Sequence, residues 1–387
     1  MDKIKKLSMD DYPEISKLSQ FAFQYTLDEE AYEKKRKQET GLDVYGYMVE
    51  GKLAGKLHIL PLEVILNEEM IKMGGIASVA TWPEYRRQGI AKKLMYHALE
   101  EMDKKDITLS YLHPFHVQFY RKLGWELSFD NHHLEIPMRS LKEIYQVVDG
   151  YVERTDEKME VVKAIYYQYA LNYNGMLNRS DHWWKYRVLR EKDWQITLAY
   201  NHAGEAEAYV IYKVKEDILY IHDFAYVNAH GKRLLYSFIA NHDSMAEMVK
   251  ITVPTNDLLR FSLADPIMKN DVEPYFMVRI VNVEKFLRLY PFSGDSLNIC
   301  IKVTDSFYRV NEGIYQIKQV GNRISVMKLE TGEAQMNCTV QQLAAMMLGY
   351  QCPLHLLENE CIHGDEERID MFKLALQTKQ TFLPDYF

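Results

Sequence analysis

The sequence predicts an α/β (α+β) protein made of three consecutive domains. Its 387 residues are enough for two to three domains at ~150 residues each. Helical and strand patterns alternate through the first 100 residues, which is typical of an α/β layer arrangement. A hairpin, a long strand and a helix at 43–97 recur faintly at 195–238, which predicts a duplicated fold.

The first domain is expected over residues 1–145, beginning with a helix and a meander of strands. Ile15, Leu18 and Phe21 recur at helical spacing near the N-terminus. Strand patterns on both sides of Gly51 predict a hairpin, and an amphipathic helix then leads into a buried strand and a short helix stopped by Gly124. The expected elements are a helix at 10–23, strands at 44–49, 53–60, 63–67 and 71–81, a helix at 88–104, a strand at 106–112 and a helix at 115–123.

The second domain is expected over residues 150–280 as a degenerate copy of the first, because 225–232 replaces the basic loop of the first copy with Tyr-Val-Asn-Ala-His-Gly. A third, α+β domain is expected over 282–387. Thr331-Gly332 predicts a hairpin turn within it. Its expected elements are helices at 281–289, 339–348 and 365–376 and strands at 297–303, 313–319 and 324–329.

Charge, cysteine content and hydropathy restrict the class of partner. There are 55 acidic and 47 basic residues, a net charge of −8 that argues against a nucleic-acid binder. The four cysteines form neither CxxC pairs nor a Cys/His zinc pattern, so we expect free thiols and no metal site. No apolar run approaches the ~18–20 residues of a membrane span, and the start lacks the apolar region of a signal peptide. The expected location is therefore cytoplasmic.

A basic turn at 86–91, between a strand and an amphipathic helix, carries the clearest chemical signal. The first-turn N–H groups of a helix are unpaired and attract anions, and Gly89 lets the backbone approach a phosphate closely. Arg86, Arg87 and Gln88 can add charge-assisted hydrogen bonds. The alternative is a solvated basic turn. The segment is neither a Walker A motif nor a dinucleotide fingerprint, because it has a single glycine and no Gly-Lys-Ser/Thr.

In this context the turn resembles the acetyl-CoA motif of the GNAT superfamily of N-acetyltransferases. The family fingerprint Arg/Gln-x-x-Gly-x-Gly/Ala reads Arg86-x-x-Gly89-x-Ala91 here. The resemblance implies acetyl-CoA as co-substrate, with a strand that splays before the turn and holds the pantetheine and the thioester. The cofactor-binding residues that it implies are Val79, Ala80, Thr81, Arg86, Arg87, Gln88, Gly89, Ile90, Ala91, Lys92, Phe115 and His116.

A second segment resembles the common end of a GNAT domain. It reads Phe119-Tyr120-x-x-x-Gly124-Trp125. A tyrosine with a pKa of ~10 is protonated at neutral pH and can donate a proton, so Tyr120 suits a general acid for the departing CoA thiolate. The alternative is a tyrosine packed under the core.

The order of the domains resembles the Enhanced intracellular survival (Eis) acetyltransferases over essentially the whole chain. These combine an active GNAT domain, a degenerate GNAT copy and a domain similar to sterol carrier protein. The resemblance implies that the α-carboxylate of the last residue, Phe387, is the general base for the incoming amine. A frayed tail is the alternative. The family resemblance also implies a homo-oligomer, a hexamer.

The substrate implied by the resemblance is a primary amine of the aminoglycoside, polyamine or lysine type, on a small molecule or a peptide, acetylated by direct transfer. Acidic residues at 28–30 and Asp385 could favour cations, although solvated surface charges are the commoner case. The alternative from another class is a non-enzymatic carrier that binds a lipid or another hydrophobic ligand in the third domain.

Overall fold

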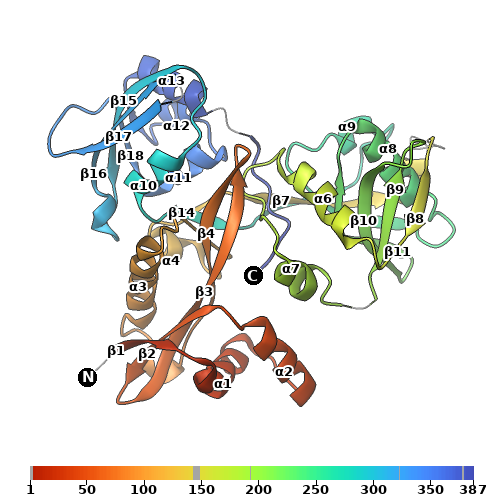
Figure 1. Cartoon of the computed structure of the whole chain (residues 1–387), viewed down its shortest axis with the longest axis horizontal. Coiled ribbons are helices and arrows are strands. Elements are labelled where there is room, and N and C mark those ends of the chain that lie inside the picture. The colour runs from red at the N-terminus through yellow and green to blue at the C-terminus, as the bar shows by residue number, and fades with distance from the viewer. Residues whose placement is uncertain (1–2, 143–148, 192, 322, 377–378) are drawn as a thin grey trace.

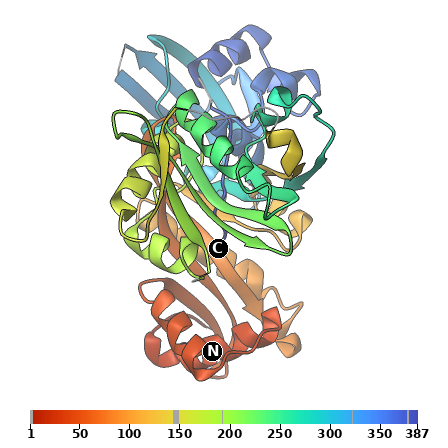
Figure 2. The same ribbon diagram turned by 90° about the vertical axis from the view of Figure 1, so that its right-hand side faces the viewer.

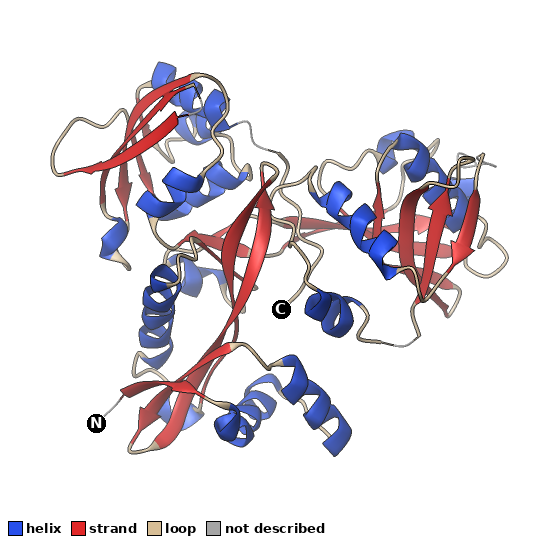
Figure 3. Ribbon diagram, in the orientation of Figure 1, coloured by secondary structure: helices blue, strands red, loops and turns tan. Residues whose placement is uncertain are grey.

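The structure is a computed structural model that describes residues 3–142, 149–191, 193–321, 323–376 and 379–387. In this part of the chain the strands form sheets of seven, seven and five strands, and each sheet is the centre of one lobe (Figure 1, Figure 2). Helices pack on the faces of each sheet, as Figure 3 shows. The α/β (α+β) fold class predicted from the sequence is confirmed.

The N-terminal lobe contains a sheet with the order β1-β2-β3-β4-β5-β14-β6. Its longest strands form a hairpin through Asn67 and Glu68, which both have positive φ as a two-residue hairpin turn favours. The strands predicted separately at 53–60 and 63–67 are therefore one strand. The strands are β1 (Lys3–Leu7), β2 (Asp43–Val49), β3 (Lys52–Leu66), β4 (Glu69–Thr81), β5 (Leu109–Leu112), β6 (Glu126–Leu127) and β14 (Met277–Ile280).

The helices of this lobe lie on both faces of the sheet. The apolar stripe of the predicted 88–104 helix is buried, from Ile90 to Met102. The helix at 29–38 was not predicted, because its sequence is almost entirely polar, and the side chain of Asp28 caps it by accepting a hydrogen bond from the Ala31 N–H (2.8 Å). The helices are α1 (Tyr12–Phe23), α2 (Glu29–Gln38), α3 (Ile90–Lys104) and α4 (Val117–Arg121).

The second lobe contains a sheet with the order β13-β7-β12-β11-β10-β9-β8. The hairpin, long strand and helix predicted from the internal repeat are present. The strands are β7 (Asp130–Pro137), β8 (Tyr151–Arg154), β9 (Gln195–Tyr200), β10 (Ala206–Lys215), β11 (Ile218–Tyr226), β12 (Met248–Val253) and β13 (Lys269–Pro274). The helices are α5 (Met138–Lys142), α6 (Met159–Ala170), α7 (Asp181–Trp183), α8 (Ala229–Ala240) and α9 (Leu259–Ser262), and a π-helical turn (Trp184–Val188) continues α7.

The first two sheets exchange strands. β7 follows the first lobe in sequence but pairs with β12 and β13 of the second sheet. β14 follows the second lobe but lies between β5 and β6 of the first sheet. The domain limits expected at 145–150 stay a prediction. Strand pairing crosses them in both directions, since each of the first two sheets contains a strand from the other's part of the sequence.

The third lobe has the strand order β17-β16-β15-β18-β19. The hairpin turn predicted at Thr331-Gly332 is wrong, because β18 pairs in parallel with β15 and not with β17. The strands are β15 (Ser296–Thr304), β16 (Gly313–Val320), β17 (Arg323–Leu329), β18 (Met336–Thr339) and β19 (His363–Gly364). The helices are α10 (Val283–Leu289), α11 (Val340–Leu348), α12 (Pro353–Glu358) and α13 (Glu366–Leu376).

A buried arginine joins the third lobe to the first. Arg279 of β14 forms an ion pair with Asp305 and donates to the Leu123 carbonyl. Its guanidinium lies where a Cβ on Gly124 would be, and Gly124 has a φ of 91°. Gly124 is therefore required at this position both by its backbone conformation and by the arginine that packs on it.

Among the described residues, no helix is long and apolar enough to cross a membrane.

Candidate active site

The site begins where β4 extends beyond its pairing with β5. β4 pairs in parallel with β5 only from Met73 to Ile76, and it continues to Thr81 beyond the last paired residue. The register with β3 also shifts, since Lys56 pairs with Ala80 and His58 pairs with Ala77. This irregularity is a bulge in β4. The expected residues Val79, Ala80 and Thr81 thus lie where the backbone groups on the β5 side lack a β5 partner.

The basic turn directly follows this strand. Arg86 Nε donates to the Thr81 carbonyl (3.4 Å) and Gln88 Nε2 donates to the Glu84 carbonyl (3.3 Å), so the turn folds back on its own start. Gly89, with a φ of 76°, precedes α3, and no side chain caps the first N–H groups of this helix. Because the first turn of α3 also has no acidic side chain, these N–H groups can accept an anion. Of the other residues expected here, Arg87 and Lys92 are exposed, Ala91 is half-buried and Ile90 is buried.

Phe115 and His116 lie at the start of α4. The ring of Phe115 is 74% exposed and packs against Tyr120 at a centroid distance of 5.4 Å. His116 caps α4 by accepting a hydrogen bond from the Phe119 N–H through Nδ1 (3.3 Å). His116 thus caps this helix, and the cofactor-binding roles expected for His116 and for the exposed Phe115 stay predictions.

Tyr120 is buried, with 3% of its surface exposed. Burial raises the pKa of its hydroxyl above the usual value near 10. The phenol therefore stays protonated at neutral pH, which is the state that a proton donor requires.

The C-terminal residue lies on the face of β4 opposite α3. The ring of Phe387 packs against Phe276 (4.8 Å between centroids) and Trp183 (5.9 Å). A Cβ on Gly75 would approach the ring to 2.6 Å, so only glycine leaves room for it. The tail is thus ordered, and it ends at the centre of the molecule between the lobes (Figure 1).

A buried network of charges holds this tail. Arg179 donates through Nε to Asp385 (3.0 Å) and through its terminal nitrogens to Asp223 (2.7 and 3.1 Å). Trp183 Nε1 also donates to Asp385 (2.7 Å), and Tyr209 donates to Asp223 (2.6 Å). Burial raises the pKa of Asp385, while Arg179 counteracts this effect. The expectation that Asp385 attracts cations is therefore wrong, since its carboxylate is buried and already paired.

A second polar cluster, on β3, was missed from the sequence. Lys56 Nζ donates to Ser78 Oγ (2.7 Å) and to the Ser78 carbonyl (3.1 Å) in the bulge, and it lies 3.1 Å from His58 Nε2. Burial lowers the pKa of Lys56 to about 7 and that of His58 well below its usual range. The available signal was a Lys and a His alternating within an apolar strand, but the sequence does not say what they face.

In the described part of the second lobe, the corresponding helix α8 begins differently. Gly231, in the first turn of α8, packs so closely on Glu207 that a Cβ would lie 2.5 Å from the Glu207 carbonyl oxygen. The Asn228 side chain accepts the hydrogen bond of the Gly231 N–H (2.7 Å). The start of α8 is therefore occupied by the lobe's own groups. In addition, the described residues contain no cluster of His, Cys, Asp and Glu that could hold a metal ion.

Family models match all three parts of the chain. An acetyltransferase (GNAT) domain matches residues 3–128, a second acetyltransferase (GNAT) domain matches 175–280, and a sterol carrier protein domain matches 283–384. Comparison with curated protein sequences finds no match.

Solved structures resemble the whole chain. A probable N-acyltransferase from Enterococcus faecalis is 27% identical with a TM-score of 0.93, and the match covers 100% of both chains. A GCN5-related N-acetyltransferase from Anabaena variabilis is 24% identical with a TM-score of 0.90, and Eis1 from Mycobacterium abscessus is 17% identical with a TM-score of 0.83, each over 100% of both chains. The last two likenesses concern the fold.

Proposed function

We propose that this chain, a GNAT-type acetyltransferase with two GNAT domains and a sterol carrier protein domain, transfers acetyl directly from acetyl-CoA to a primary amine in its N-terminal lobe. The observation that carries the proposal is the arrangement around β4. The proposal assigns four features to one site: the bulged strand beyond its β5 pairing, the uncapped N-terminus of α3, the buried Tyr120 and the C-terminal Phe387.

The binding of acetyl-CoA is supported by the chemistry of the turn. The pyrophosphate would bind to the N–H groups at the start of α3 and to Arg86, Arg87 and Gln88. The pantetheine arm would bind along residues 79–81, whose backbone groups on the β5 side lack a β5 partner.

Different residues accept and donate the protons in the proposed reaction. The substrate ammonium loses a proton to the α-carboxylate of Phe387, and the free amine attacks the thioester carbonyl. The new N–C bond forms as the C–S bond breaks, and Tyr120 donates its proton to the leaving thiolate. The second proton that the nitrogen loses on becoming an amide restores the proton of Tyr120. A carboxylate with a reference pKa of ~3.3–3.7 is a weak base, so the pocket must make the ammonium more acidic.

The amine class within this proposal includes aminoglycosides, polyamines and lysine-type amines on small molecules or peptides. Asp28 does not select among them, since its side chain is used as a helix cap. The exposed Glu29 and Glu30 lie in the first turn of α2, where they stabilise the helix dipole.

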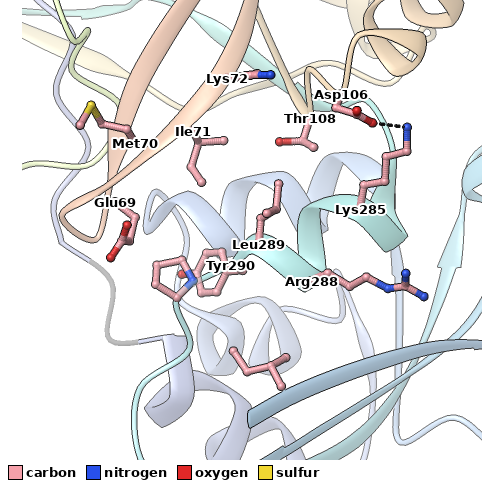
Figure 4. Close-up of a pocket in the computed structure, with 12 residues that line it drawn as sticks. Glu69, Met70, Ile71, Lys72, Asp106, Thr108, Lys285, Arg288, Leu289 and Tyr290 are labelled. Carbon is pink, nitrogen blue, oxygen red and sulfur yellow. Dashed lines mark hydrogen bonds and ion pairs between the residues drawn. The ribbon is translucent and has the colours of Figure 1, made fainter. Parts of the chain in front are cut away.

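The carrier alternative is less well supported. A cavity of about 770 Å³ lies between β4 and α10, with Met70, Ile71, Leu289 and Tyr290 in its wall (Figure 4). It is a cleft between two lobes and not a cavity inside the sterol carrier domain. Asp106 and Lys285, which line it, form an ion pair (2.7 Å). Mass spectrometry of lipids that co-purify with the protein would test this alternative.

Self-association is also part of the proposal. Leu258, Phe261 and Ile267 of the second lobe are 65%, 88% and 84% exposed. Large apolar side chains that gather on a surface often mark a protein–protein interface. We propose that this segment packs against another copy of the chain in a homo-oligomer, a hexamer.

The test is thiol release from acetyl-CoA with a panel of primary amines. Wild type is compared with Tyr120→Phe and with a chain that carries one extra glycine after Phe387. We expect both variants to lose most of kcat while acetyl-CoA binding, measured by calorimetry, is unchanged. Full activity of the extended chain would exclude the terminal carboxylate as the base. Absence of acetyl-CoA binding by wild type would overturn the whole proposal.

A further inference from the structure

The acceptor side of the site can be located from the alternation of side chains on β3 and β4. A Cβ on Gly74 would point to Met102 of α3, whereas a Cβ on Gly75 would point to Phe387. On β3, a Cβ on Gly55 would meet Ile90 of α3, so the next side chains on the other face are Lys56 and His58. Phe387 and the Lys56 cluster therefore share the face opposite α3.

Positive charge predominates on this face. Lys56 bonds to Ser78, Lys35 of α2 donates to the Tyr25 hydroxyl, and Arg187 of the π-helical turn lies 5.6 Å from the Trp183 ring. In the described part of the chain, none of these three cations forms an ion pair with a carboxylate. Lys56 is buried, whereas Lys35 and Arg187 are half-buried. A half-buried arginine without a carboxylate partner can bind an acidic ligand.

Among the described residues, Glu39 is the acidic side chain that acts on this cluster, and it favours the charged forms of Lys56 and Arg187. Lys56, Lys35 and Arg187 each lower the pKa of the Glu39 carboxyl group, but its burial has the larger effect and raises that pKa. The pKa of His58 is lowered by its burial and also by the charges of Lys56, Lys35 and Arg187. These charges thus disfavour protonation of His58.

A cavity of about 200 Å³ opens beside the cluster and next to the C-terminal tail. Its wall includes Arg187, Arg190, His222 and Tyr386. Asp223 and Asp385 also line it, and both carboxylates pair with Arg179. Arg190 pairs with Glu191 (3.5 Å). Arg187 is therefore the cation of this wall that has no carboxylate partner in the described structure, and its guanidinium presents planar donors that match a carboxylate.

We propose that the acceptor carries a carboxylate in addition to its amine, and that Arg187 binds this carboxylate in the cavity beside Tyr386. The acceptor is then an amino-acid-like molecule and not a polyamine or an aminoglycoside. This inference rests on the proposed function, since it assigns the substrate class of the same site. The tail that forms part of the cavity wall ends in the carboxylate that takes the proton, so binding at Arg187 brings the amine toward its base.

The experiment compares amines that differ only in the carboxylate. Thiol release is measured with lysine against cadaverine, ornithine against putrescine, and phenylalanine against phenethylamine. The comparison is made for wild type, for Arg187→Gln and for the matched control Lys185→Gln, which removes a positive charge from the same turn at an exposed position outside the cavity wall. The shift in Tm caused by each amine, with CoA bound, is a second readout that does not need turnover.

We expect wild type to prefer the amino acid of at least one pair by tenfold or more in kcat/KM. Arg187→Gln should abolish this preference mainly by raising KM for the amino acid, and it should remove the Tm shift caused by the amino acid. Lys185→Gln should behave as wild type. Equal or better use of the decarboxylated amines by wild type would overturn the inference and leave the proposed function standing. If no amine is acetylated and no amino acid shifts Tm, both fail together.

Discussion

Replacing Gly75 by alanine tests the position of the C-terminal residue directly. The added Cβ would lie 2.6, 3.0 and 3.1 Å from three ring carbons of Phe387. Because carbon atoms in contact prefer separations of about 3.5–4.0 Å, the ring must move by about 1 Å. The α-carboxylate belongs to the same residue and moves with the ring. A displacement of about 1 Å in a reacting group can lower a rate by about 100-fold, which corresponds to about 2.7 kcal/mol.

We therefore expect kcat of Gly75→Ala to fall about 100-fold, with the Kd for acetyl-CoA unchanged. Gly74→Ala is the matched control, since its Cβ would strike the Sδ of Met102 on the opposite face and leave Phe387 untouched. The assay is steady-state thiol release, with Tm measured for both variants. Wild-type kcat in Gly75→Ala, or an equal loss in Gly74→Ala, would refute the reasoning.

Four other predictions follow from buried or exposed groups. Burial raises the pKa of Tyr120 above about 10, so kcat should not decline between pH 7 and 9; a decline there would exclude Tyr120 as the acid. Arg179→Met leaves two buried carboxylates without their shared cation and should lower the free energy of unfolding in urea by about 3–5 kcal/mol, and a loss below about 1 kcal/mol would contradict this. The pKa of Lys56 is about 7 in the folded chain and about 10.4 in the unfolded chain, so the unfolded chain binds more protons between these two pH values. The free energy of unfolding of wild type should therefore rise with pH in this range, and it should rise less steeply in Lys56→Met. Phe261→Glu should reduce the molar mass of the assembly in light scattering, and an unchanged mass would exclude this segment as an interface.

The fold of each lobe could be predicted from the sequence because local patterns specify it. Apolar spacing identified α3, and the strand before the basic turn was recognisable from its composition. The exchange of β7 and β14 could not be predicted, since a strand pattern indicates which face is buried but not which sheet the strand joins. α2 was missed because a polar helix held by its cap has no apolar period.

Part of the candidate site could likewise be predicted from the sequence, and part of it could not. Arg86 and Gly89 belong to a local motif, so their place at the start of α3 followed from sequence. The cluster of Lys56 with Ser78 joins residues 22 apart in the chain through a bulge, and the pairing of Arg179 with Asp385 joins residues 206 apart. Such contacts depend on tertiary packing, and a single sequence contains no periodic signal for them.

The exchanged strands also set an order of events during synthesis. When the ribosome has made the first 145 residues, β5 and β6 have no strand between them, and β7 has neither of its partners. Unpaired strand edges of this kind are prone to join other chains. They are covered only once β12, β13 and β14 have emerged, so the two GNAT lobes must mature together. A gene fragment that encodes either lobe alone is accordingly a poor starting point for expression, whatever its predicted boundary.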